Sequence, residues 1–241
     1  MIASIIPIIN FLLVFFYLPD TKPNSEINKS KTALKNPLKA LFTVFKEEKI
    51  KKLSLAFVIY FIAFTGLTKI LIFFIQESLN WTTKASSGTL VVVGIIAIIV
   101  QGGLIGPLVK QFGEMRLTLI GSGFILLACI LLITAPKENA TINIYSAVSF
   151  LAVGAGLITP TLRALISKKL DVDKQGSILS NLQGLQSLGG VLGIAMAGRV
   201  YDSFGPKSPF IAGSVILLFM IYLIAEGKNN NSFNNQNSKL S

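Results

Sequence analysis

Polar side chains interrupt the apolar runs of this sequence, and they are the residues with which it could do chemistry. They are two cations and four amides: Lys69, Arg163, Gln101, Asn181, Gln183 and Gln186. A charge at the centre of a membrane span costs roughly 2.5 to 3.5 kcal/mol on insertion scales, and amides in hydrocarbon need hydrogen-bonding partners. These groups must therefore face a cavity or a partner, and we treat them as candidates for a substrate path.

Residues for covalent or metal chemistry are scarce. The chain has no histidine, which removes Ser-His and Cys-His nucleophile pairs, the HExxH zinc site and the usual general base at neutral pH. Its single cysteine, Cys129, lies in an apolar run, so an intramolecular disulfide and a cysteine-rich metal site are excluded. We expect no enzymatic activity, no metal and no cofactor, and the missing histidine also disfavours a protease of the membrane interior.

The composition predicts that lipid surrounds these polar groups. Hydrophobic residues make up 52% of the chain and charged residues 14%, with a mean hydropathy of +0.68. This leaves too little polar material to coat a water-soluble globule. The apolar residues form unbroken runs without the alternation of a lipid-facing barrel strand. The sequence thus predicts an all-α, polytopic membrane helix bundle.

Seven apolar segments have about the 20 residues that a helix needs to cross a bilayer. They cover about 1–18, 53–76, 87–109, 116–135, 142–166, 176–200 and 209–226. The first lacks the basic start and cleavage site of a secretory signal, so we interpret it as a retained span. The predicted organisation is a span at 1–18, a linker at 19–52, a six-helix bundle at 53–226 and a disordered, low-complexity tail at 227–241.

The net charge of +11 has a membrane explanation that needs no nucleic acid. When the linker is placed in the cytoplasm, its side of the membrane holds sixteen of the 22 Lys and Arg residues and the opposite side holds four. This is a strong positive-inside bias, and the cations face anionic lipid headgroups. We expect a protein of the plasma or inner membrane with its amino terminus outside and its carboxyl terminus in the cytoplasm.

The linker contains a helical pattern of its own. Asn36 is a suitable helix cap and Pro37 suits the first helical position. Apolar residues then recur at helical spacing while lysines take the other face, which predicts an amphipathic helix on the inner membrane surface. The alternative is a solvated, charged connector with chance periodicity.

A polar stretch, GPLVKQFGEMRLTLIG at 106–121, separates the third and fourth runs. Lys110 and Glu114 suit the end of one helix and the start of the next, where their charges complement the helix dipoles. Gly113 can supply the left-handed backbone of a tight turn, and Arg116 can reach lipid phosphates. Taken alone, this pattern fits an ordinary, well-capped turn.

The stretch also resembles a loop motif of the major facilitator superfamily, in its second-half copy. Gly106, Lys110, Gly113 and Arg116 match the motif, although Lys110 stands where the first-half copy usually has an aspartate. GAGLITPTLRALISKKL at 154–170 and QGSILSNLQGLQSLGGVLGIAMAGRVYDSFG at 175–205 are similar to the tenth and eleventh helices of the drug and proton antiporter branch. The resemblance implies that residues 1–226 hold the end of helix six, the central linker and helices seven to twelve.

The segment similar to helix eleven carries two kinds of residue on one face. Gln183 and Gln186 are followed at helical spacing by small residues, Gly189, Gly190, Gly193 and Ala197. Small residues allow close helix packing, whereas amides need partners, so this face either packs or lines a cavity. Lys69 either snorkels to the outer interface or serves the path, and Gln101 and Arg163 lie near the inner ends of their segments.

The resemblance implies a transporter that moves a small organic molecule by alternating access between two six-helix halves, of which this chain supplies the second. Acidic residues avoid the centres of the segments, so proton coupling by this chain alone is not expected. Its expected partners are membrane lipids, a small organic substrate and an amino-terminal half or a second copy of itself. The alternative is a non-transporting membrane fragment or accessory subunit, and upstream coding sequence would distinguish the two.

Overall fold

A computed structural model describes residues 14, 16, 41–135 and 140–237. The chain divides into two units, residues 1–35 and 36–241, and the second contains the helical bundle. The predicted span at 1–18 and most of the predicted linker at 19–52 thus fall outside the described residues.

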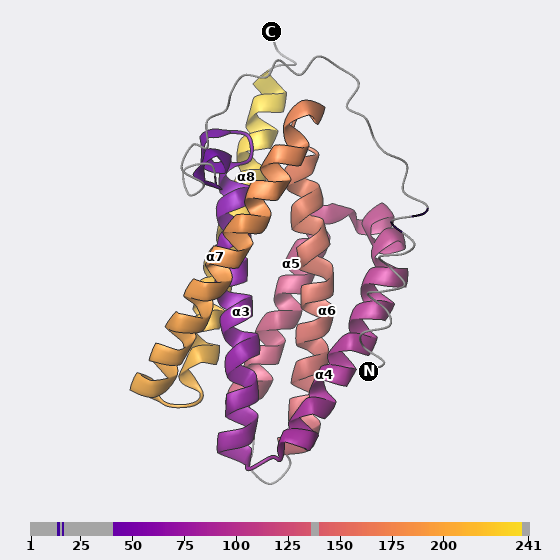
Figure 1. Cartoon of the computed structure of the whole chain (residues 1–241). Coiled ribbons are helices and arrows are strands. Elements are labelled where there is room, and N and C mark those ends of the chain that lie inside the picture. The colour runs from indigo at the N-terminus through magenta and orange to yellow at the C-terminus, as the bar shows by residue number, and fades with distance from the viewer. Residues whose placement is uncertain (1–13, 15, 17–40, 136–139, 238–241) are drawn as a thin grey trace. The chain divides into compact units, whose positions relative to one another are not determined.

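Six long helices build the bundle, and they run alternately up and down in Figure 1. They are α3 (Lys51–Leu79), α4 (Thr83–Ile99), α5 (Ile105–Thr134), α6 (Ala140–Ser167), α7 (Val172–Phe204) and α8 (Ser208–Asn237), with a π-helix η2 (Val100–Leu104) between α4 and α5. The described residues contain no strand. The prediction of an all-α membrane bundle is therefore confirmed.

Four stretches of the described residues are long and apolar enough to cross a membrane. They are Lys51–Glu77, Thr83–Thr134, Ala140–Ser167 and Ser208–Glu226. The second stretch holds two of the predicted spans, because the chain turns back within it at Gly113. Helix α7 is absent from this group, since its amides and glycines lower its hydropathy, although its 33 residues give it a length of about 50 Å.

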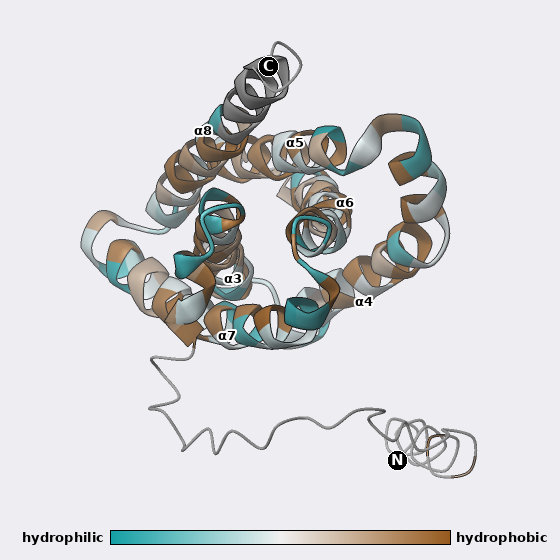
Figure 2. Ribbon diagram, turned by 90° about the horizontal axis from the view of Figure 1, so that it is seen from above, coloured by the Kyte–Doolittle hydropathy of each residue, from teal (hydrophilic) through white to brown (hydrophobic). Residues whose placement is uncertain are grey.

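Seen from above, α3 and α6 occupy the middle of the bundle (Figure 2). Helices α4 and α7 lie on one side of this central pair, and α5 and α8 lie on the other. Glycines bring particular helices into close contact: an added Cβ at Gly121 would lie 2.9 Å from the carbonyl oxygen of Gly154, where α5 meets α6. Helix α3 meets α7 in the same way, so α3, α7 and α8 form one packed group and α4, α5 and α6 another.

The end of the linker differs from the predicted surface helix. Within the described residues it forms only a short 3-10 helix, η1 (Phe42–Lys46), which contacts α3 and α7. Val44 is completely buried in the core, as is Ile50 just before α3. Leu41 and Phe45 of the predicted apolar face also pack partly against this core, whereas Phe42 is exposed. The Glu47 carboxylate accepts a 2.6 Å hydrogen bond from Lys174 and raises the pKa of that lysine.

The tail also differs from its prediction. Helix α8 continues to Asn237, whereas residues 227–241 were expected to be disordered. The segment from 228 to 237 contains no proline, so nothing in it interrupts the helical hydrogen bonds once α8 has begun.

Candidate functional site

A polar cluster joins α6 to α7 on one face of the bundle, where Arg163 and Gln186 are half-buried and Gln183 is exposed. One amino nitrogen of the Arg163 guanidinium, Nη2, donates hydrogen bonds to the Oε1 atoms of both Gln183 and Gln186, each 2.6 Å long. Gln183 and Gln186 are three residues apart on α7, so both amides lie on the face that meets Arg163. The structure thus brings together three candidates that the sequence offered separately.

A cavity of about 360 Å³ lies between α3, α4 and α6, and Thr159 in its lining is one helical turn before Arg163. Its lining is largely apolar, with Phe64 on α3 and Ala152 on α6 among its walls, and its polar members include Thr68, Thr159 and Gln101. Such a lining, with a few polar groups, is typical of sites for small organic molecules. Gln101, a predicted path residue, therefore lines a cavity, and it lies in η2, a local widening of the helix that is frequent at functional sites.

A hydroxyl bridge spans the inner wall of this cavity. Tyr60 of α3 is completely buried, and its hydroxyl lies 3.3 Å from the hydroxyl of Thr159 on α6. On the other side of α6, Thr161 lies 2.9 Å from the hydroxyl of Thr118 on α5. These residues were not among the predicted ones, because threonine and tyrosine are common in apolar runs and give no distinct signal there.

Two of the predicted path residues lie elsewhere. Asn181 donates a 3.2 Å hydrogen bond to the hydroxyl of Thr43, so it binds the end of the linker. Lys69 is exposed on α3 and does not contact the Arg163 cluster. Its two alternatives, snorkelling to the interface and serving the path, both stay open.

The loop motif forms the turn between η2 and the main part of α5. Gly113 has φ 75° and ψ 158°, a combination essentially limited to glycine. The positive φ was expected, although this conformation is not the left-handed helical one of an ordinary cap. At the same end of the bundle, the Glu114 carboxylate forms an ion pair with Lys168, which directly follows α6. This ion pair was not predicted. Gly106, Lys110 and Arg116 are all exposed.

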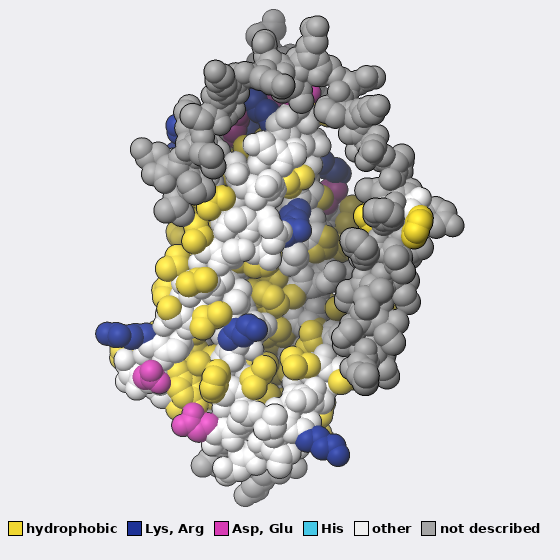
Figure 3. All heavy atoms as spheres, in the orientation of Figure 1, with side chains coloured by type: hydrophobic (Ala, Val, Ile, Leu, Met, Phe, Trp, Pro, Cys, Tyr) yellow, Lys and Arg dark blue, Asp and Glu magenta, His cyan; other side chains and the backbone are white. Residues whose placement is uncertain are grey.

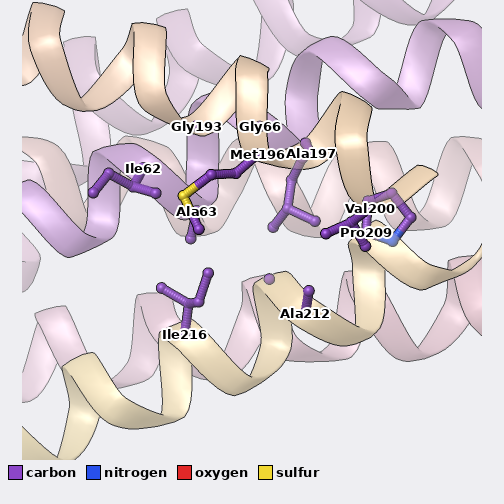
Figure 4. A pocket seen from close by; sticks show the side chains of 12 residues that line it. Ile62, Ala63, Gly66, Gly193, Met196, Ala197, Val200, Pro209, Ala212 and Ile216 are labelled. Carbon is purple, nitrogen blue, oxygen red and sulfur yellow. The ribbon is translucent and has the colours of Figure 1, made fainter. Parts of the chain in front are cut away.

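The small residues of α7 pack against α3. An added Cβ at Gly193 would lie 2.1 Å from the carbonyl oxygen of Ile62, and one at Gly66 would lie 2.7 Å from the carbonyl oxygen of Gly193. Figure 4 shows this contact beside a small apolar pocket of about 40 Å³ that α8 also lines. Gly189 is buried in the same contact, and Gly190 and Ala197 are half-buried beside it. The small residues thus hold α7 to α3, while the amides of the same helix reach α6.

Positive and negative side chains occupy different parts of the face of the bundle that Figure 3 shows. The eight carboxylates among the described residues lie near helix ends, next to the turn at Gly113 or, for Glu226, at the end of the apolar stretch of α8: they are Glu47, Glu48, Glu77, Glu114, Asp171, Asp173, Asp202 and Glu226. In Figure 3, dark-blue cations stand on the middle of the face, whereas magenta carboxylates lie toward its ends. The middle of the described face is therefore apolar with a positive charge.

Comparison with known proteins assigns this helical arrangement to a family. The family model described as Major Facilitator Superfamily matches residues 1–194, which is most of the chain. The chain belongs to the major facilitator superfamily. The predicted resemblance to this superfamily is thereby confirmed. Together with its apolar helices, membership of this superfamily of transporters makes the chain an integral membrane protein.

Several curated relatives are similar to this superfamily member at low identity. The tetracycline resistance protein of class H from Pasteurella multocida is 25% identical over 83% of the chain and 49% of its own length. The class C protein from Escherichia coli is 27% identical over 54% of the chain and 32% of its own length. Hippocampus abundant transcript-like protein 1 from Homo sapiens is 19% identical over 93% of the chain and 49% of its own length. The chain spans about half the length, or less, of these relatives.

Proposed function

We propose that the six described helices act as the second half of a secondary transporter that moves a small organic molecule. One observation supports this most strongly: a cavity of about 360 Å³ lies one helical turn along α6 from the Arg163, Gln183 and Gln186 cluster, on a face of an otherwise apolar bundle. Polar groups inside a membrane protein are costly and are kept where substrates pass. The face formed by α3, α4, α6 and α7 is the substrate path in this proposal.

Alternating access requires a second bundle opposite this face. In transporters of this type the substrate binds near the midplane between two repeats, which rock against each other. The relatives are about twice as long as the matched region, so they have room for such a bundle. We propose that a preceding part of the polypeptide or a separate chain supplies it here.

Drug efflux is the direction of transport that the relatives favour. Two of them carry the name tetracycline resistance protein, which points to export of an organic molecule. The carboxylates of the described residues lie near helix ends, next to the turn at Gly113 or at the end of the apolar stretch of α8, so a proton carrier in mid-membrane has to come from the opposing bundle. This chain would then contribute substrate contacts, and its partner bundle would contribute the coupling.

The test is accumulation of tetracycline or a fluorescent dye in cells that lack their own pumps. The cells produce this chain, the amino-terminal six helices of the class H relative, both or neither. We expect reduced accumulation only when both are present. Efflux by this chain without any other facilitator half would contradict the proposal. Unchanged accumulation in every combination would favour a non-transporting membrane subunit.

Variants of the cluster test whether this face is the path. Gln183→Leu and Gln186→Leu remove the acceptors of Arg163 and should reduce transport more than they reduce the amount of protein. Ser187→Leu is the matched control, because its hydroxyl bonds only the Gln183 carbonyl of its own helix. Equal loss of transport in all three variants would argue against a specific role of the amides.

We further propose that η1 and the turn at Gly113 face the cytoplasm. The charge asymmetry of the sequence supports this orientation, since the lysine-rich linker and tail lie on the same side. Single cysteines replacing Gln111 and Val172 in a Cys129→Ala background should react with an impermeant thiol reagent only from inside. Cysteines replacing Thr82 and Pro206 should react only from outside, and labelling of all four from one side would reject the orientation.

A further inference from the structure

Arg163 carries a positive charge that no described residue neutralises. The ion pairs among the described residues join other cations, namely Lys52 to Glu226, Lys168 to Glu114 and Lys174 to Glu47. The partners of Arg163 are the oxygens of two neutral amides. The charge of a half-buried guanidinium held only by neutral groups is uncompensated, and beside apolar surface it attracts an anion.

The cluster presents hydrogen-bond donors to any ligand. A guanidinium only donates, so the amide oxygens of Gln183 and Gln186 must face it, and their NH₂ groups must point away. Within the part of the chain that the structure describes, neither amide nitrogen has a partner, and Nε and Nη1 of Arg163 have none. A ligand that enters the cluster therefore meets several N–H groups and no unoccupied amide oxygen.

The surroundings of Arg163 provide room for a ligand with an apolar body. Ala152, Gly156 and Thr159 line the 360 Å³ cavity from α6, and Arg163 follows them on the same helical stripe, one turn after Thr159. A second hollow of about 260 Å³ lies next to the guanidinium and is lined by Arg163, Ala164, Ser167 and Leu179. Along α6, the last residue that lines the apolar cavity, Thr159, is thus followed one turn later by a positive charge with a hollow of its own.

We infer that Arg163, Gln183 and Gln186 form an anion-binding subsite, and that the transported molecule is an amphiphilic organic anion. Its carboxylate, sulfonate or phosphate group contacts Arg163, and its apolar body occupies the cavity between α3, α4 and α6. The claim that this anion is transported rests on the proposed function, whereas the anion-binding subsite can be tested by binding alone. The phosphate of an anionic lipid has the same chemistry, so the experiment separates these two sources.

The experiment measures protection of a cysteine placed in the hollow beside Arg163. The full chain with Cys129→Ala and Ala164→Cys is reconstituted in phosphatidylcholine nanodiscs and alkylated with N-ethylmaleimide. The probes are 1-pyrenebutyrate and 1-pyrenebutanol, which share an apolar body and differ in the anionic group. We expect half-maximal protection at an about tenfold lower concentration of the anionic probe, as one charge-assisted hydrogen bond provides.

Two variants assign this difference to the subsite. Arg163→Gln removes the charge, and Gln183→Glu keeps the hydrogen bond to Arg163 while neutralising it. Both should abolish the preference for pyrenebutyrate, and Gln183→Glu should do so with an unchanged helical circular dichroism spectrum. Equal protection by the two probes, or a preference that survives in the folded Gln183→Glu variant, would overturn the subsite.

Nanodiscs containing phosphatidylglycerol separate the sources of the anion. Protection by pyrenebutyrate that persists in these nanodiscs supports a substrate anion. Protection by phosphatidylglycerol without any probe assigns the subsite to a lipid phosphate and overturns the substrate class. The assay measures binding and needs no transport. If the chain does not transport, the assay therefore still shows whether the subsite binds an anion.

Discussion

Helix α3 makes two kinds of contact on its two flanks. Toward α7 it approaches so closely that Gly193 leaves no room for a Cβ against the Ile62 carbonyl. Toward α6 it keeps its distance, and the 360 Å³ cavity lies next to the hydroxyl bridge from Tyr60 to Thr159. The first contact depends on the absence of side-chain atoms, and the second depends on a few polar atoms across a space.

This difference separates stability from function within one helix. Dispersion contacts between closely spaced backbones are lost as soon as one atom is added, because packed interiors cannot absorb the volume. A hydroxyl bridge contributes little net free energy in a membrane, but it fixes the position of the atoms around a cavity. Changes at the first contact should reduce the amount of folded protein, and changes at the second should reduce activity.

The largest expected effect comes from breaking the contact between α3 and α7. Gly193→Ala places a Cβ 2.1 Å from the Ile62 carbonyl oxygen. The helices must separate, at a cost of about 3 kcal/mol, the upper range for overpacking. The measurement is thermal unfolding followed by alkylation of Cys129, which is completely buried in the folded chain. Gly198→Ala on the same helix is the control, because nothing lies within 4 Å of its added Cβ.

A smaller effect is expected at the turn between η2 and α5, outside both contacts. Gly113→Ala forces a side chain into a backbone conformation that costs about 1 to 3 kcal/mol for residues other than glycine. Gly106→Ala is the control, since its surroundings are open and its φ is not positive. Equal melting temperatures of the two variants would show that residue 113 relaxes to a helical conformation.

The hydroxyl bridge should tolerate substitution better than either glycine. Tyr60→Phe removes one hydrogen bond and should cost about 1 kcal/mol of stability. Transport with an opposing bundle should fall more than protein abundance does, because the wall of the cavity loses its fixed position. Thr159→Val completes a double-mutant cycle. Additive effects of the two changes on unfolding would show that the hydroxyls do not interact.

The smallest effect is expected at the membrane surface. Lys52 and Glu226 join α3 to α8 through a 2.7 Å ion pair, with side chains 42% and 40% exposed. Exposed pairs contribute about 0 to 1 kcal/mol and are screened by salt. Glu226→Gln should therefore lower the unfolding temperature only slightly, and less at high ionic strength. A loss as large as that of Gly193→Ala would mean that this pair, and not the glycine contact, holds the group together.

The sequence predicted the helices well and their meeting points poorly. The expected segments at 53–76 and 142–166 lie inside α3 and α6, because a long apolar run in lipid has only the helix available to satisfy its backbone. For the glycines at positions 189–193 the sequence left helix packing and cavity lining open, and the structure places them against α3. The helix that a given glycine contacts depends on how each helix is rotated about its own axis, and the local sequence does not determine this rotation.

The polar site shows the same limit. The sequence marked Arg163, Gln183 and Gln186 as costly in lipid. Predicting the hydrogen bonds between them, however, requires knowing how far α6 and α7 are shifted along each other. Tyr60 and Thr159 gave no signal, because hydroxyls in an apolar run can also bond to their own helix. The π-helix η2 was missed for a related reason, since its extra residue leaves no mark on an apolar pattern.

The weak hydropathy of α7 has a consequence for biogenesis. A segment rich in amides and glycines partitions poorly into lipid when it leaves the ribosome, whereas α8 after it is strongly apolar. We expect α7 to stay at the translocon until the synthesis of α8 allows both to enter as a hairpin against α3. In a released chain truncated before Ser208, α7 should therefore stay accessible to a protease, whereas the apolar stretches of α3 and α6 should already be protected by the membrane.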